Sequence, residues 1–307
     1  MTLSCLHTHT IFCDGAADPE TMCRAAFAKG FESIGFSSHA PAARKIGFET
    51  GWHLPEEKLP RYIEEVLEAR KRWEGRLKVY LGLEVDHIRG ICGPADKDIQ
   101  ELPLDYVIGA VHYVISPKNG ELFSVDGPEK EFGPGLKLHF DNDGAALCAA
   151  YYGMYASLIR NGGCDILAHM DLIKKNNRSF RFFSPADPAY GTLLRETADL
   201  AAAASGPGGP ANGSAAGAPE DRRPIVEVNT GGLIRGRTAD CYPSPELLGL
   251  LWERNVPLTI NADAHAPEHL GGGYERARQD MIRAGYSTML LFGGRKNGRA
   301  LWREEPL

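Results

Sequence analysis

Short apolar segments alternate along the chain with longer segments whose apolar residues recur at helical spacing. Short runs rich in β-branched and other apolar residues are typical of buried strands, and spacings of three and four residues are typical of amphipathic helices. We predict strands at residues 3–6, 33–37, 79–85, 106–111, 165–168, 225–228 and 258–261, with a short further one at 287–291. We predict helices at residues 18–29, 60–73, 145–161 and 192–204.

The start and end signals of the first helix illustrate these predictions. Asp18 is a suitable N-cap, Pro19 fits the first helical position, and Gly30 is a suitable stop. In the segment 60–73, Tyr62 and Val66 belong to an apolar face, while Glu and Arg residues fill the other.

Strands that alternate with helices indicate parallel βα units. Seven or eight such units in 307 residues fit a closed barrel better than an open sheet. One segment, residues 205–219, is rich in Gly, Ala and Pro and interrupts the alternation. Because strands continue on both sides of it, we interpret it as a flexible insertion in a single domain spanning 1–307.

The composition is ordinary for a globular protein, with 43% hydrophobic and 24% charged residues. The net charge of −6 disfavours a surface that coats nucleic acid. The seven cysteines form no CxxC pair, which favours a reduced protein in the cytoplasm. We find neither a signal peptide nor an apolar run long enough to span a membrane, so we expect no membrane association.

Nine residues that could bind metal ions lie at or just after the predicted strands. The carboxyl ends of the strands in a βα barrel open on one face, so these residues should converge there. They are His7, His9, Asp14, His39, Glu84, His112, His169, Asp263 and His265. Imidazoles and carboxylates are ligands of Zn, Fe and Mn, and nine of them suit two or three ions.

Local spacing supports the same interpretation. His7 and His9 are two residues apart on an extended chain, so their side chains point the same way. Asp263 and His265 repeat this arrangement. A lone histidine at a strand end is more often a structural residue, and we assign that role to His53, His87, His139 and His269, which are not at strand ends.

With these residues identified, the sequence resembles the PHP (polymerase and histidinol phosphatase) superfamily. The motifs that carry the resemblance run from residue 6 to residue 265 and are LHTHT with CDG, SSHAP, GLEVD, GAVHY, AHMDL and NADAH. Within the superfamily the chain is most similar to the histidinol-phosphate phosphatases of histidine biosynthesis. Three segments favour that group, namely AHMDLIKK, EVNTGGLIRG and CYPSPELL.

The resemblance implies a distorted (β/α)7 TIM-like barrel that holds three divalent metal ions, with Zn, Fe and Mn as the candidates. It implies a first metal bound by His7, His9, Glu84 and Asp263, a second bound by Glu84, His112 and His169, and a third bound by Asp14, His39 and His265. Many relatives have histidine where this chain has Asp14, which could change the metal preferred at the third position.

The implied chemistry is hydrolysis of a phosphate monoester, most simply of L-histidinol phosphate to L-histidinol and phosphate. Three divalent ions, three carboxylates and a hydroxide leave about two positive charges, which suits a phosphate dianion. Our hypothesis is that a hydroxide bridging two metals attacks phosphorus. Asp263, His265 and Arg235 are the candidate catalytic residues. Arg235 is also the candidate phosphate ligand, with Arg237 and Lys174 as further substrate-binding candidates, although Lys174 and Lys175 could equally be a solvated pair.

Two other functions stay open at this point. The chain could be a PHP phosphoesterase for a nucleotide, a sugar phosphate or phosphotyrosine, because the metal ligands would be the same. It could instead be a non-catalytic metal-binding module, although every expected ligand position carries a competent residue. An amidohydrolase barrel also has HxH after its first strand, but here Glu84 would take the place of its carboxylated lysine. We expect a monomer or a homodimer with a small-molecule substrate.

Overall fold

The computed structural model describes residues 2–205 and 223–307. Its main sheet has seven parallel strands in the order β1-β2-β3-β4-β7-β8-β9. The strands are β1 (Leu3–Cys5), β2 (Phe31–Phe36), β3 (Lys78–Asp86), β4 (Tyr106–Ala110), β7 (Ile166–Leu167), β8 (Ile225–Asn229) and β9 (Leu258–Asn261). All seven predicted strands are therefore confirmed, with shifts of a few residues at their ends.

The two edges of this sheet meet just beyond β1 and β9. Thr8 and Ala264 form a parallel bridge. In it the His9 amide donates to the Ala264 carbonyl over 2.9 Å, and the Ala264 amide donates to the His7 carbonyl over 3.0 Å. These bonds close the sheet into a barrel, so the predicted TIM-like barrel is confirmed.

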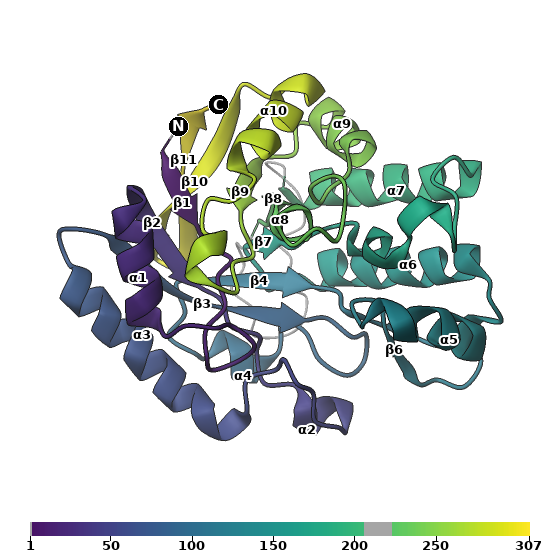
Figure 1. Cartoon of the computed structure of the whole chain (residues 1–307), viewed down its shortest axis with the longest axis horizontal. Helices are drawn as coiled ribbons and strands as arrows, with labels where there is room; N and C mark the ends of the chain where they lie inside the picture. Colours follow the sequence, from purple (N-terminus) through teal and green to yellow (C-terminus); the bar gives the residue numbers. More distant parts are fainter. Residues whose placement is uncertain (1, 206–222) are drawn as a thin grey trace.

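Helices surround the barrel (Figure 1). The longer ones are α1 (Pro19–Ala28), α3 (Leu59–Trp73), α5 (Glu129–Phe140), α6 (Gly144–Asn161), α7 (Pro188–Ser205), α9 (Pro245–Glu253) and α10 (Tyr274–Ala284). The short α-helices are α2 (Ala43–Ile46), α4 (Lys97–Gln100) and α8 (Gly231–Ile234), and the 3-10 helices are η1 (Glu56–Lys58), η2 (Leu172–Asn176), η3 (Arg178–Phe180) and η4 (Pro267–His269). The four predicted helices are α1, α3, α6 and α7.

The capping predicted for the first helix is present. The Asp18 carboxylate accepts from the Thr21 amide over 2.7 Å, and Pro19 begins α1. Gly30 follows the helix with a φ of 77°, a conformation that costs glycine little. The insertion predicted at 205–219 begins at Ser205, the last residue of α7, and its remainder lies outside the described residues.

The interior of the barrel is apolar at the amino ends of its strands. Tyr106 lies across it and donates to the Leu6 carbonyl over 2.5 Å. Glycines at 35 and 82 leave room for this ring, since a Cβ on either would lie 2.5 Å from Tyr106. Ile108 and Ala110 follow on the same face of β4 and line the same buried cluster.

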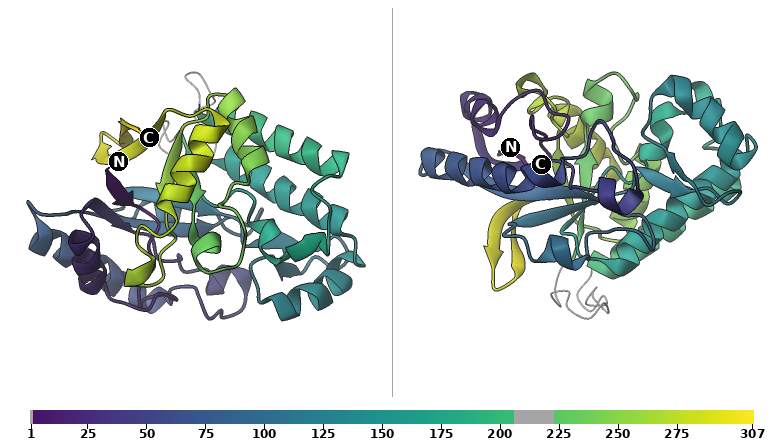
Figure 2. Two further views of the ribbon diagram at one scale, coloured as in Figure 1. Left: turned by 45° about the horizontal axis from the view of Figure 1, so that its top comes forward. Right: turned by 90° about the horizontal axis from the view of Figure 1, so that it is seen from below.

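The further strand predicted at 287–291 exists but is not part of the barrel sheet. It is β10 (Thr288–Lys296), and it pairs antiparallel with β11 (Arg299–Pro306). Phe292 from this hairpin packs edge-on against Tyr80 and Tyr106, with ring centroids 4.9 and 5.6 Å apart. The hairpin therefore covers the amino end of the barrel and leaves the other end for the site (Figure 2).

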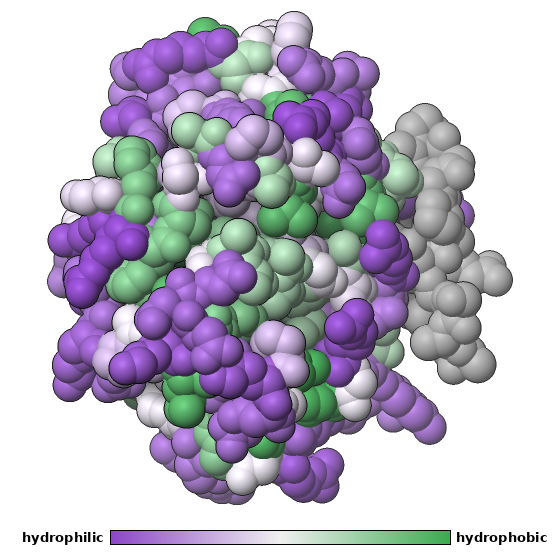
Figure 3. Space-filling view, turned by 90° about the vertical axis from the view of Figure 1, so that its right-hand side faces the viewer, coloured by the Kyte–Doolittle hydropathy of each residue, from purple (hydrophilic) through white to green (hydrophobic). Residues whose placement is uncertain are grey.

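Hydrophobic and hydrophilic residues are mixed on the face beside α5, α6 and α7, with apolar side chains gathered near its middle (Figure 3). Leu138 of α5 is 60% exposed and Phe180 of η3 is 68% exposed. No α-helix in the described ranges 2–205 and 223–307 is long and apolar enough to cross a membrane.

Candidate metal centre

The strand geometry explains why the predicted ligands share one end of the barrel. Tyr106, Ile108 and Ala110 point into the interior, and His112 continues the same alternation beyond β4. Glu84 lies two residues before the end of β3, and the chain around His39 pairs with it in a parallel bridge. The nine predicted residues are thus brought together although they span residues 7 to 265 of the sequence.

Glu84 is the centre of this group. Its side chain is 1% exposed. Its two oxygens lie 3.0–3.5 Å from imidazole nitrogens of His7, His9, His39, His112 and His169. A carboxylate contacted from both sides by imidazoles is suited to bridge two metal ions.

The remaining predicted ligands lie on the side of the group nearer the surface. His9 Nε2 is 3.2 Å from Asp263 Oδ1, and His265 Nε2 is 3.2 Å from Asp14 Oδ2. Asp14 is the most exposed of these side chains, at 28%. The cluster therefore extends from a closed interior at Glu84 to an accessible edge at Asp14.

In the part of the chain that the structure describes, candidate ligand atoms form four groups, each with its atoms within 4.8 Å of one another. The groups are His9 with Asp14, His39 and His265; His7 with His9 and Asp263; His7 with Glu84 and His169; and His39 with Glu84 and His112. The first group contains the three ligands expected for the third metal, and the second group contains three of the four ligands expected for the first metal. The last two groups share Glu84. Of the other two ligands expected for the second metal, one of these groups holds His169 and the other holds His112.

Unpaired polar atoms indicate that these residues fit metal ions. Among the described residues, the buried atoms His7 Nε2, His9 Nε2 and Glu84 Oε2 make no hydrogen bond, although Glu84 Oε2 lies 3.1 Å from His7 Nε2. Buried polar atoms are almost always paired, and leaving them unpaired is costly. Burial and the nearby His265 and His39 lower the pKa of His9 to about 3, which keeps its ring neutral and a lone pair available. Divalent cations would satisfy all three atoms.

Glu227, in β8, is a functional residue that the sequence analysis did not identify. It is fully buried, and its Oε2 lies 3.0 Å from His7 Nδ1. A hydrogen bond at Nδ1 fixes the imidazole tautomer and leaves Nε2 free to bind a metal. The available signal was a glutamate flanked by apolar residues in the strand sequence IVEVN.

Asp86 is the second such residue, and it plays the same part for His112. Its Oδ1 accepts from His112 Nδ1, and its Oδ2 lies 2.7 Å from His53 Nε2. Burial lowers the pKa of His112, but the carboxylates of Asp86 and Glu84 outweigh it and raise the pKa to about 10. Asp86 lies two residues after Glu84 on the same strand face, and this spacing could have revealed it.

The four histidines that we did not assign to the metal site are in none of the four ligand groups found among residues 2–205 and 223–307. His87 bonds the Ser157 hydroxyl over 2.9 Å, away from the cluster. His53 reaches the site indirectly through Asp86, and His269 accepts from the His265 amide over 3.3 Å. His139 lies on α5.

A cavity of about 90 Å³ opens beside the cluster and holds most of the predicted substrate residues. Arg235 and Arg237 line it. The Arg235 guanidinium donates from Nη2 to Asp263 Oδ2 over 3.0 Å, which holds it at the edge of the metal ligands. The other residues along the cavity are Asp14, His39, Trp52, Glu84, His112, Asp126, His169, Leu172, Lys175, Gly232, Tyr242, Asp263 and His265.

The structure differs from the prediction at Lys174, which is not among the cavity-lining residues. Its ammonium group donates to Asp171 Oδ2 over 3.0 Å and to the Cys241 carbonyl over 2.6 Å. These bonds tie η2 to the segment before Tyr242. Its neighbour Lys175 lines the cavity instead.

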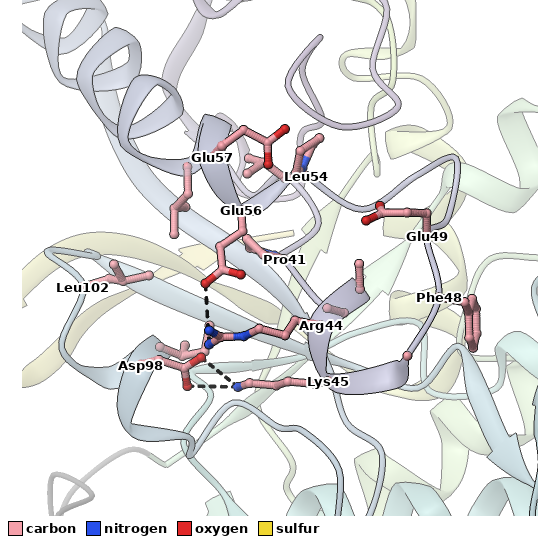
Figure 4. A pocket seen from close by; sticks show the side chains of 16 residues that line it. Pro41, Arg44, Lys45, Phe48, Glu49, Leu54, Glu56, Glu57, Asp98 and Leu102 are labelled. Carbon is pink, nitrogen blue, oxygen red and sulfur yellow. Dashed lines mark hydrogen bonds and ion pairs between the residues drawn. The ribbon is translucent and has the colours of Figure 1, made fainter.

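A larger pocket, of about 830 Å³, lies beside α2 and α4 (Figure 4). Both of its basic side chains are already paired, Arg44 with Glu56 over 3.5 Å and Lys45 with Asp98 over 2.8 Å. None of the nine candidate ligands lines it. We therefore assign the chemistry to the smaller cavity.

Comparison with known proteins identifies the family of the chain. The PHP domain family matches residues 6–203. A protein of Deinococcus radiodurans named "Probable histidinol-phosphatase" is 29% identical over 284 residues, which cover 92% of this chain and 94% of that protein.

Two solved structures share the fold. The first, from Listeria monocytogenes and described as a candidate histidinol phosphatase, has a TM-score of 0.73 and 19% identity, covering 89% of this chain and 99% of the other. The second is histidinol phosphate phosphatase from Lactococcus lactis complexed with Zn, L-histidinol and phosphate, with a TM-score of 0.65 and 19% identity over 96% and 99% of the two chains. Because the family match covers more than half of the sequence, the chain belongs to the PHP domain family.

Proposed function

We propose that this protein is a metal-dependent phosphomonoesterase that hydrolyses L-histidinol phosphate to L-histidinol and phosphate. The observation that carries the proposal is Glu84, a buried carboxylate contacted by imidazoles on both oxygens, beside a cavity whose wall holds arginines. The substrate is proposed from the names of the relatives and from the L-histidinol and phosphate bound in the Lactococcus lactis structure.

The nine predicted residues would hold three divalent ions, with Glu84 as the bridging ligand. Ions held in this way supply Lewis acidity and lower the pKa of a bound water. Glu227 and Asp86 orient His7 and His112 through the Nδ1 atoms of the two rings. Because these carboxylates are buried and bonded, the imidazoles are fixed in direction before a ligand arrives.

Arg235 is the proposed phosphate ligand because its position is fixed. Nη1 donates to the Asp263 carbonyl over 2.6 Å and Nη2 to the Asp263 carboxylate. A planar guanidinium held in place is suited to phosphate oxygens, and it stabilises charge that develops on them. Arg237 and Lys175 add positive charge along the same cavity.

The alkoxide that leaves phosphorus needs a proton from a group at the cavity. Asp263 and His265 are the proposed candidates to take up the proton that the attacking water loses and to pass it to the alkoxide, since both line the cavity and both lie beside Arg235. In this scheme Arg235 screens the negative charge of Asp263 while the phosphate is bound.

The test is phosphate release by purified protein supplied with Zn, Mn or Fe(II), across L-histidinol phosphate, a nucleotide, a sugar phosphate and phosphotyrosine. We expect the highest kcat/KM for L-histidinol phosphate, and loss of activity in Glu84→Ala. Equal or better turnover of another monoester would refute the substrate assignment while leaving the phosphatase activity in place. A location in the cytoplasm and a monomeric or homodimeric state are parts of the same proposal.

A further inference from the structure

One carboxylate in the cavity has no role in the proposed metal centre. The carboxylates along the cavity are Asp14, Glu84, Asp126 and Asp263. Three of these are candidate metal ligands, and Asp126 is not. The proposed substrate carries an ammonium group in addition to its phosphate, so a spare carboxylate at the cavity wall needs an explanation.

The chain places Asp126 in the wall by way of a hairpin. β5 (Tyr113–Ile115) leaves the barrel directly after His112, and β6 (Leu122–Ser124) returns antiparallel to it. The Val125 amide then donates to the His112 carbonyl over 2.9 Å. This bond joins Val125, which precedes Asp126 in the sequence, to the backbone of the candidate metal ligand His112.

Asn176, which is 5% exposed, holds the backbone on both sides of Asp126. Its side-chain amide donates to the Val125 carbonyl over 3.3 Å and to the Gly127 carbonyl over 3.0 Å. A buried amide used in this way fixes the backbone of a loop. The Asp126 side chain is therefore directed by the fold and not by a mobile loop end.

The Asp126 carboxylate is only partly engaged by protein groups. Its Oδ1 accepts from Lys175 Nζ over 2.5 Å, and the same ammonium reaches the Asp126 carbonyl over 2.8 Å. Within the described parts of the chain, Oδ2 accepts no hydrogen bond, and the side chain is 36% exposed. A carboxylate has about four acceptor positions, so it can accept from a second ammonium group.

Tyr242 provides an independent sign of a ligand beside Asp126. The ring is 1% exposed and the residue lines the cavity. Within residues 2–205 and 223–307, its buried hydroxyl has no hydrogen-bond partner. Asp126 and Tyr242 line the same cavity, and burial first, and then the charge of Asp126, raise the pKa of Tyr242. A buried hydroxyl with no partner that lines a cavity is completed by a polar group of a bound molecule.

We propose that Asp126, beside the unpaired hydroxyl of Tyr242, forms the subsite for the ammonium group of the substrate. The cavity would then select phosphate monoesters of amino alcohols, with the phosphate at Arg235 and the metal ligands and the ammonium group at Asp126. This inference rests on the proposed function and deepens it. It assigns to Asp126 a role in specificity and none in the chemical step.

The test compares two substrates in the Asp126→Asn variant. One is L-histidinol phosphate, and the other is the analogue that lacks its amino group, 3-(imidazol-4-yl)propyl phosphate. Losing a charge-assisted hydrogen bond should raise KM for L-histidinol phosphate about 10- to 100-fold, with kcat little changed. KM for the analogue should stay within about twofold of wild type. Asp199→Asn is the matched control, because that exposed aspartate pairs with Arg254 away from the cavity.

Lys175→Met separates this role from a purely structural one. If Asp126 served only to position Lys175, both variants would weaken both substrates to the same extent, and that result would overturn the proposal. Equal thermal unfolding temperatures of Asp126→Asn and wild type would exclude a folding defect as the cause of a selective loss.

Calorimetric binding of L-histidinol provides a readout that needs no turnover. The proposal expects wild type to bind L-histidinol more tightly than Asp126→Asn does, again by about 10- to 100-fold. Failure of wild type to hydrolyse L-histidinol phosphate, with this difference in binding intact, would refute the proposed function alone. Equal binding by the two proteins would refute the subsite.

Discussion

Glu227 gives the sharpest test of how the metal centre is held. Its Oε1 accepts from the His169 amide over 3.0 Å and from Asn229 Nδ2 over 2.8 Å. Its Oε2 lies 3.0 Å from His7 Nδ1 and accepts from Asn261 Nδ2 over 2.9 Å. The His169 amide and the side-chain amides of Asn229 and Asn261 present N–H groups to the carboxylate. His7 Nδ1 does the same in the tautomer that leaves Nε2 free for a metal, so Glu227→Gln cannot be accommodated by turning the amide over.

In either orientation the NH2 group that this substitution introduces would face two donors. Two buried donors without an acceptor should cost about 2–6 kcal/mol of folding free energy, at ~1–3 kcal/mol each. The hydrogen bond that fixes the His7 tautomer is weakened at the same time, so metal affinity should fall ~10- to 100-fold. Both effects come from one atom, because the substitution changes a single oxygen to nitrogen.

The assays are urea unfolding of the metal-free protein and metal content after dialysis against graded chelator. The control is Glu253→Gln, the same substitution at a side chain that is 61% exposed. It should change neither measurement. Retention of wild-type metal affinity in Glu227→Gln would refute the role assigned to Glu227 in orienting His7.

The remaining predictions concern the barrel, the cysteines, the metals and the phosphate ligand. Phe292→Ala should cost ~3–5 kcal/mol in urea unfolding, because the ring fills the barrel end; a loss below about 1 kcal/mol would contradict this packing. Burial raises the pKa of four thiols to about 12, namely those of Cys23, Cys92, Cys148 and Cys241. At pH 8 these thiols should react with a disulfide reagent only after the protein is denatured. In the native protein their reaction should become faster as the pH rises. Chelation should abolish phosphate release, and added divalent metal should restore it; full activity without metal would refute the proposed chemistry. Arg235→Lys should lower kcat/KM ~10- to 100-fold, because an ammonium group cannot offer phosphate oxygens the paired N–H groups of a planar guanidinium. Unchanged kinetics would show that Arg235 is not a phosphate ligand.

The periodic parts of the fold were predictable because their signals are local. Asp18 and Pro19 begin a helix through contacts within one turn, and the buried strands are short apolar runs. Helix α5 was missed because Pro134 lies within it, and proline in a helix interior is a strong contrary signal. The partner of β10 was missed because β11 alternates with charged residues and pairs outside the barrel.

The convergence of the candidate ligands was also predictable, since it follows from strand ends meeting on one face. Their directions were not. His169 and Asp263 have φ values of 21° and 49°, which non-glycine residues rarely adopt, so alternation along a strand does not give their orientation. Lys174 and Lys175 are adjacent in sequence, and only the turn of η2 decides which of them reaches the cavity.

The bridge between Thr8 and Ala264 also has a consequence for the order in which the protein is made. During synthesis His7 and His9 leave the ribosome well before Asp263 and the strand edge that closes the barrel. Contacts so distant in sequence form late in folding. Until they form, the imidazole of His7 has neither Glu227 nor Asp263 beside it. Metal loading is therefore a step that follows synthesis of the barrel, and the unclosed barrel is the state most prone to aggregate or to bind the wrong metal.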